Sequence, residues 1–208
     1  MEKSFEAKFA TRSGWLCLDF ANTVDWHASA KPEETLRDYR DLALWAKSVG
    51  VVAAPAAEAL IALGEKEPAA ARRAWRQAIE LREAIYRILS HRARGEEADE
   101  SDLSALNAAM ARLLPGMRLI SGNGGVDWAW SVDEGRLDSF LAPVVWSAVQ
   151  LLTLDAVERV GQCADDRGCG WLFYDTSRNK SRRWCDMKDC GNRAKSRRHY
   201  RKAHAKVT

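Results

Sequence analysis

The chain has 208 residues, with 32 lysines and arginines, 29 aspartates and glutamates, and 47% hydrophobic residues that include nine tryptophans. This length accommodates one ordinary domain with a small appended module, and the hydrophobic content excludes a disordered chain. No apolar run reaches the eighteen residues that a membrane span requires, so we expect no membrane association.

Helices dominate the prediction for the first 160 residues. In 14–24, Leu16, Phe20 and Val24 follow helical spacing, although Leu16, Leu18 and Phe20 also fit a strand; we favour a short buried helix. An amphipathic helix is predicted from about residue 36 until Gly50 ends it. Further helices are predicted at 55–63, at 68–92 and from residue 99 or 101 to 114.

A β-hairpin is predicted next, with strands at 117–121 and 126–131. The Gly-Asn-Gly-Gly loop at 122–125 supplies the positive-φ positions that such a turn requires. The most apolar helix is predicted at 137–160, as a core helix or a dimer interface. The expected fold of residues 1–160 is therefore mainly α with a small β-hairpin.

Four of the five cysteines lie in the last quarter of the chain, in the pattern Cys163-x5-Cys169-x15-Cys185-x4-Cys190. Two short ligand pairs separated by a loop suit a closed tetrahedral zinc site, so we predict one structural Zn²⁺. Disulfides are disfavoured because residues near Met1 do not resemble a secretory leader and we expect a reduced, cytoplasmic compartment. Cys17 is interpreted as a small buried hydrophobe.

Residues 161–208 are predicted to form a treble-clef-like zinc finger. Strands are expected at 171–175 and 182–184, and a basic helix at 192–205 that starts beside Cys190. Such a unit buries too little surface to fold alone, so metal binding is expected to supply much of its folding free energy.

Charge is divided unevenly along the chain. Residues 178–208 hold twelve lysines and arginines against two aspartates, whereas acidic residues exceed basic ones in residues 1–177. A basic end favours a polyanionic partner, although a solvated tail has the same composition. Arg193 has a second interpretation, because a cation beside four thiolates offsets their charge. The candidate nucleic-acid contacts are Arg182, Arg183, Arg193, Lys195, Arg197, Arg198, Arg201 and Lys202.

Three polar residues, Asp19, Asn22 and Thr23, alternate with apolar ones near the first predicted helix. Buried polar groups need hydrogen-bond partners, so a structural contact is the ordinary interpretation. The alternative is a small-molecule effector pocket. Its candidate walls are Trp15, Trp26 and Trp45.

From residue 163 onward the sequence resembles the CGNR zinc-finger family, named for the tetrapeptide Cys190-Gly191-Asn192-Arg193. Cys169-Gly170 and Arg183-Trp184-Cys185-x-Met187 support this likeness. The front is similar to the ABATE domain of bacterial stress-induced transcription regulators, through Leu16-x-Leu18-Asp19-Phe20-x-Asn22-Thr23. The resemblance implies a DNA-binding transcriptional regulator whose four C-terminal cysteines hold zinc.

The leading hypothesis is therefore a zinc-dependent DNA-binding regulator, with residues 1–160 as a sensor or dimerisation body. Binding of RNA or protein by the same finger is the alternative, because a fold does not determine its function. An enzyme is not expected: a closed sulfur site leaves no open metal position, and the sequence has no phosphate-binding glycine-lysine motif.

Overall fold

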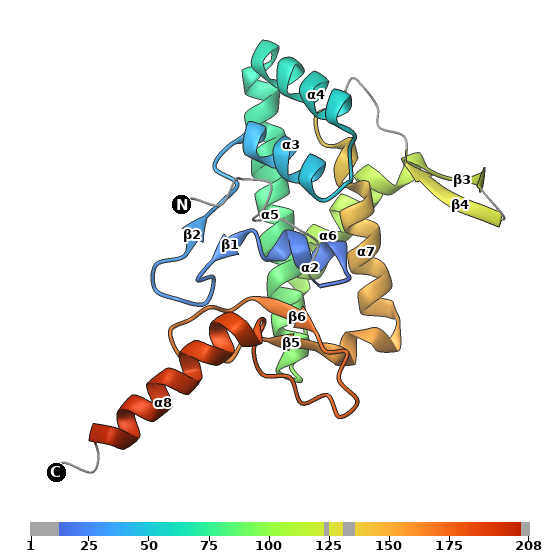
Figure 1. The fold of residues 1–208 in the computed structure, drawn as a ribbon. Coiled ribbons are helices and arrows are strands. Elements are labelled where there is room, and N and C mark those ends of the chain that lie inside the picture. Colours follow the sequence, from blue (N-terminus) through green and yellow to red (C-terminus); the bar gives the residue numbers. More distant parts are fainter. Residues whose placement is uncertain (1–12, 123–124, 131–135, 205–208) are drawn as a thin grey trace.

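The computed structural model describes residues 13–122, 125–130 and 136–204. Within these residues, α5 and five further helices form a body in which α5 is the longest element (Figure 1). We call residues 13–153 the helical body and residues 160–204 the zinc module. The helices of the body are α2 (Leu16–Ala21), α3 (Tyr39–Ser48), α4 (Ala54–Lys66), α5 (Pro68–Ala93), α6 (Glu100–Leu113) and α7 (Ala142–Thr153).

The core of the helical body lies where α2 packs against α5 and α7. Phe20 of α2 and Trp45 of α3 are completely buried, and their ring centroids lie 4.9 Å apart. One side of α7 is buried in the same core, through Ala142, Val144, Val145, Ala148 and Leu151. The short buried helix predicted near residue 16 is thus confirmed, and α2 owes its burial to neighbours distant in sequence.

Sequence signals locate the helix starts well. Asp38 caps α3, because its side chain accepts a hydrogen bond from the backbone N–H of Asp41 at 2.9 Å. Pro55 lies in the first turn of α4 and Pro68 opens α5, where a missing N–H costs nothing. No helix in the described part of the chain is long and apolar enough to cross a membrane.

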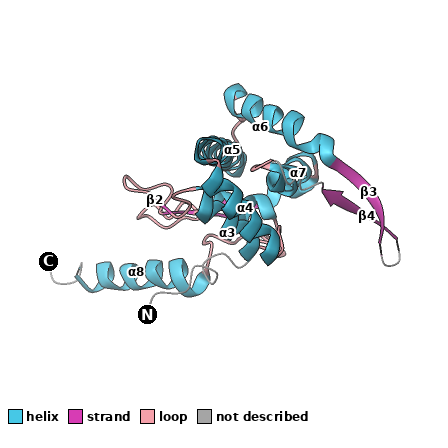
Figure 2. Ribbon diagram, turned by 90° about the horizontal axis from the view of Figure 1, so that it is seen from above, coloured by secondary structure: helices cyan, strands magenta, loops and turns pink. Residues whose placement is uncertain are grey.

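Each of the three sheets in the described residues is a pair of antiparallel strands. β1 (Val24–Asp25) pairs with β2 (Glu33–Glu34). β3 (Met117–Gly122) pairs with β4 (Gly125–Trp130), which confirms the predicted hairpin, and this hairpin projects from the body in Figures 1 and 2. Residues 123–124 of its predicted loop lie outside the described residues. β5 (Val160–Gln162) pairs with β6 (Leu172–Tyr174).

Two predictions around the zinc module are wrong. The helix predicted at 137–160 ends at Thr153, and the chain continues through a 3₁₀ turn, η3 (Asp155–Arg159), into β5. The partner strand of β6 is therefore β5 and not residues 182–184. Residues 182–184 instead lie in a loop, where the backbone N–H of Arg182 donates to the Asp175 carboxylate at 2.8 Å. This buried carboxylate draws the loop inward and leaves β5 to pair with β6.

The zinc module ends in a π turn, Met187–Gly191, followed directly by α8 (Asn192–His204). Asp186 caps the turn by accepting a hydrogen bond from the Lys188 N–H at 2.6 Å. From there α8 extends away from the rest of the molecule (Figures 1 and 2). A mainly helical chain with small sheets and a C-terminal four-cysteine module is thus the observed fold.

Candidate metal centre and nucleic-acid interface

Four cysteines converge at the junction of the β5–β6 hairpin and the start of α8. The sulfur atoms of Cys163, Cys169, Cys185 and Cys190 all lie within 4.8 Å of one another. The Cys169–Cys185 and Cys185–Cys190 sulfur pairs are 3.7 and 3.6 Å apart. Zinc–sulfur bonds of about 2.3 Å give a tetrahedron with edges of about 3.8 Å. The donor set and its spacing therefore fit one Zn²⁺.

Local structure explains where each ligand lies. Cys163 directly follows β5, and its N–H extends the strand pairing by donating to the Trp171 carbonyl at 2.8 Å. Cys169 lies between Gly168 and Gly170, whose φ angles of +86° and +69° allow the sharp return of the chain. Cys190 belongs to the π turn that precedes α8. The hairpin thus presents Cys163 and Cys169, the π turn presents Cys190, and Cys185 lies in the loop before that turn, so that all four meet at one point.

The four thiols have different pKa values because they contact one another. Hydrogen bonds from Cys169 and Cys185 lower the pKa of Cys163. Hydrogen bonding to Cys163 and Cys169 raises the pKa of Cys185, and burial raises that of Cys190. Four adjacent thiols therefore do not all ionise together on their own, because like charges repel. A divalent cation removes this conflict, and this is the chemistry expected of a metal site.

Arginines next to the cysteines turn toward the metal centre. The Asp165 side chain is fully buried between Cys163 and Cys169, and it accepts from Arg193 at 3.3 Å and from Arg197 at 2.9 Å. Arg193 also places its Nη2 2.8 Å from the sulfur of Cys190 and pairs with Asp189. Arg197 pairs with Asp166 as well, at 2.5 Å. These two arginines of α8 thus neutralise acidic groups within the module.

The other predicted nucleic-acid contacts divide into two groups. Arg182 donates to the carbonyls of Trp184 and Cys185 and stacks on the Phe173 ring, so it holds the loop together. Arg183, Lys195 and Arg198 are exposed. Lys195 and Arg198 form no salt bridge with any residue that the structure describes. The side chains of Arg201 and Lys202 lie outside the described residues.

The polar residues near α2 have clear partners. The side-chain amide of Asn22 donates to the Leu172 carbonyl and accepts from the Leu172 N–H, both at 2.8 Å, which ties α2 to β6. Thr23 is buried, where its hydroxyl donates to the Phe20 carbonyl. Asp19 accepts from the backbone N–H of Ser13 at 3.2 Å.

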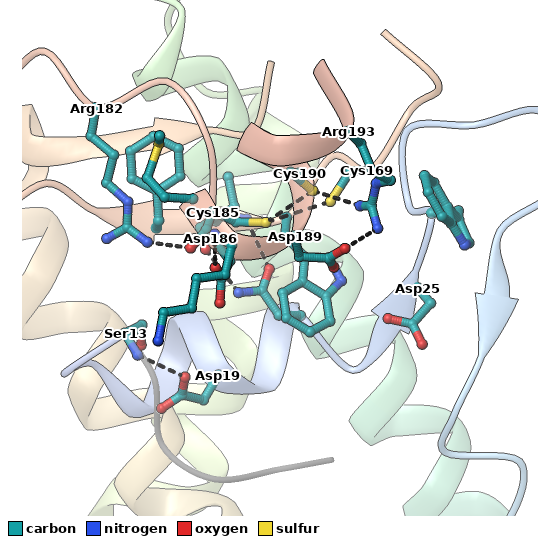
Figure 3. A pocket seen from close by; sticks show the side chains of 17 residues that line it. Ser13, Asp19, Asp25, Cys169, Arg182, Cys185, Asp186, Asp189, Cys190 and Arg193 are labelled. Carbon is teal, nitrogen blue, oxygen red and sulfur yellow. Dashed lines mark hydrogen bonds and ion pairs between the residues drawn. The ribbon is translucent and has the colours of Figure 1, made fainter. Parts of the chain in front are cut away.

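A cavity of about 820 Å³ lies between α2 and the metal centre (Figure 3). Asp19 and Asn22 line it from α2, and Trp26 lines it from the loop after β1. Cys185 and Arg193 line it from the zinc module. Of the tryptophans predicted as walls, only Trp26 is among the described lining residues, since Trp45 is in the core and Trp15 packs against Tyr174.

Comparison with known families agrees with this division of the molecule. Residues 14–155 match ABATE, described as a putative stress-induced transcription regulator, and so cover more than half of the chain. The chain belongs to the ABATE family. Residues 159–203 match the CGNR zinc finger, and the four cysteines of this segment are positioned to bind one zinc ion. No curated protein matches the chain.

Sequence reasoning missed Asp165, Asp166 and Trp26 as parts of the metal centre. The two aspartates carry a local signal, because they are acidic residues between zinc ligands and close to a basic segment. Trp26 carries none, since it lies 137 positions before the first ligand in a segment without cysteines. Only the fold brings it to the zinc module.

Proposed function

We propose that this protein is a zinc-dependent DNA-binding regulator in which the outward side of α8 meets the phosphate backbone. The observation that carries the proposal is the sorting of charges on α8. Arg193 and Arg197 point inward and are paired, whereas Lys195 and Arg198 are exposed on a helix that extends from the body. A projecting helix with cations on its free side can approach a nucleic acid without unfolding the zinc module.

Duplex DNA suits this geometry because the major groove admits an α-helix, while lysine and arginine on its flanks bind phosphate. Exposed Arg183, from the loop beside Cys185, adds a further cation to the zinc module. Single-stranded RNA is the rival partner, since the same charges attract any polyanion. An acidic protein surface is the other rival, and both enter the test as competitors.

The test compares two double variants of the zinc-loaded protein. Lys195→Gln with Arg198→Gln removes two exposed charges from α8, and Arg72→Gln with Arg73→Gln removes two exposed charges from α5. Fluorescence anisotropy with labelled genomic fragments should show the α8 variant weakened by about a hundredfold at 0.1 M salt, with the salt slope reduced by about two. The α5 variant should bind like the wild-type protein.

Two results would overturn the proposal. One is DNA binding that does not change with salt or with the α8 substitutions. The other is preference for single-stranded RNA or an acidic protein over duplex DNA in direct competition. Zinc content measured on every sample ensures that a lost metal is not mistaken for a lost contact.

The helical body is proposed to act as the sensor. The cavity between α2 and the π turn supports this role, because a molecule bound there would touch Asp19 and Asn22 on one side and Met187 and Lys188 on the other. Its volume of about 820 Å³ lies within the range of small-molecule sites. A metabolite library screened by thermal shift should yield compounds that stabilise the wild-type protein but not Met187→Trp, which narrows the cavity. A library without such a compound would contradict the sensor role.

A further inference from the structure

We propose that the helical body completes the metal centre, with Trp26 as a positioning residue for the zinc site. Trp26 lies in the loop between β1 and β2, far from every cysteine ligand in sequence. In the structure it packs against the cluster of Cys163, Cys169 and Cys190. Metal binding at this centre does not depend on DNA being the partner.

The loop contacts the backbone of the zinc module directly. The N–H of His27 donates to the Cys169 carbonyl at 3.0 Å, and the N–H of Ala28 donates to the Gly168 carbonyl at 3.2 Å. The turn itself closes through a hydrogen bond from the Ser29 N–H to the Trp26 carbonyl at 2.8 Å. The carbonyls on both sides of a zinc ligand are therefore held by amides from the helical body.

Both partners in this contact have unusual backbones. Trp26 has a φ of +56°, a left-handed conformation that is strained for a residue with a side chain. A Cβ added to Gly168 would lie 2.7 Å from the Ser29 backbone, and one added to Gly170 would lie 2.6 Å from the Ala28 nitrogen. The absence of a side chain at Gly168 and Gly170 thus lets the loop approach closely. The surrounding hydrogen bonds hold Trp26 in its left-handed conformation.

The Trp26 ring is a platform for two cations beside the metal. The guanidinium of Arg167 lies 4.8 Å from the ring centroid and that of Arg193 lies 5.1 Å from it. Arg193 in turn places Nη2 2.8 Å from the sulfur of Cys190. The side chain of Trp26 therefore fixes the cation that contacts a zinc ligand, at the point where α8 begins.

The helical body holds this loop firmly. His27 lies 3.0 Å from the Glu83 carboxylate and stacks on Tyr86 with ring centroids 3.5 Å apart. The Tyr86 hydroxyl donates to the Gly170 carbonyl at 3.1 Å. Residues of α5 thus contact both the loop between β1 and β2 and the β5–β6 hairpin. The position of Trp26 is consequently set by the body, and the zinc module alone lacks it.

The first test measures zinc affinity by competition with a chromogenic chelator. Trp26→Ala should bind zinc about 10- to 100-fold more weakly than the wild-type protein, the effect of losing a group that orients a ligand. Trp26→Phe keeps a smaller aromatic platform and should fall between the two. Trp146→Ala is the matched control, because Trp146 is another half-buried tryptophan, packed on Trp128 away from the cysteines.

Circular dichroism of each zinc-loaded variant shows whether the helical body is folded. Wild-type zinc affinity in a folded Trp26→Ala protein overturns the proposal, and so does an equal loss of affinity in Trp146→Ala. If Trp26→Ala does not fold, Trp26→Phe decides in the same way.

The second test runs in the opposite direction, from the metal to the helical body. Removing zinc with a chelator should make the backbone amides of His27 and Ala28 exchange with solvent at least tenfold faster, because their acceptors lie beside Cys169. Hydrogen exchange followed by NMR on the wild-type chain measures this change. The amide of Leu42 in α3 is the internal control. Unchanged exchange at His27 and Ala28 in the zinc-free protein would overturn the proposal.

Discussion

The helical body and the zinc module are stabilised by different interactions. The body buries whole aromatic and aliphatic side chains, with Phe20, Trp45 and Phe140 almost completely hidden from solvent. In the zinc module, the cluster at its centre consists of Cys163, Cys169 and Cys190 surrounded by indole rings. A large chain segment can gain enough from apolar burial, whereas a short one needs strong bonds from a few atoms.

The two regions also use arginine differently. Arg82 in the body is buried and donates to Glu34 and Glu83, so its charge is satisfied within the core of the fold. In the zinc module, arginines surround the metal centre and one of them contacts a ligand sulfur. The comparison shows that charge serves packing in one region and metal chemistry in the other. Four experiments test this difference, in order of decreasing effect.

Loss of one zinc ligand should have the largest effect, because it should unfold the zinc module and leave the helical body folded. Cys190→Ser is expected to remove up to about 10 kcal/mol of metal-derived folding free energy from the zinc module. Circular dichroism and zinc analysis should show α8 and the metal lost together, while the helices of the body stay folded. Complete unfolding of the chain would show that the body has no independent stability.

Arg82→Ala should produce the largest loss within the helical body. Its removal empties a completely buried site and leaves exposed Glu34 and half-buried Glu83 without this cation, and truncating such a large buried side chain costs about 2–5 kcal/mol. Chemical denaturation of the zinc-loaded protein measures this change. Arg72→Ala, at an exposed position of α5, should stay within about 0.5 kcal/mol of wild type.

Arg197→Ala and Arg198→Ala should differ although the residues are neighbours. Arg197 pairs with the fully buried Asp165, so its loss is expected to cost about 1–3 kcal/mol in the stability of the zinc module. Arg198 is exposed and its loss should cost less than about 0.5 kcal/mol, while it lowers DNA affinity. Zinc-loaded thermal melts and binding assays run together show this separation. Equal stability losses would mean that both arginines serve the fold.

The smallest effect is expected at Cys17. Burial raises the pKa of this thiol from 9.0 to about 12, so it stays protonated and unreactive in the folded protein at pH 8. Iodoacetamide should therefore label the four zinc cysteines after chelation, and Cys17 only after denaturation. Mass spectrometry counts the adducts. Early labelling of Cys17 would indicate that the body opens when the zinc module loses its metal.

Most helices of the body and the four-cysteine pattern were predictable because their signals are local, but the end of α7 was not. Pro55 and Pro68 mark helix starts, and the four cysteines have the spacing that zinc requires. The partner of β6 was not predictable in this way. Residues 182–184 carry strand-like side chains, but the Asp175 carboxylate binds their backbone and β5 takes the pairing instead.

The sequence by itself determined the class of the molecule: a helical ABATE domain followed by a four-cysteine zinc module with a basic helix. Only the tertiary structure decided which cations of α8 are paired, because Asp165 and Asp166 turn Arg193 and Arg197 inward, whereas Lys195 and Arg198 are exposed. It also decided that Trp26 belongs to the metal centre. Both outcomes depend on contacts between residues that are distant in the sequence, and local spacing and composition do not predict such contacts.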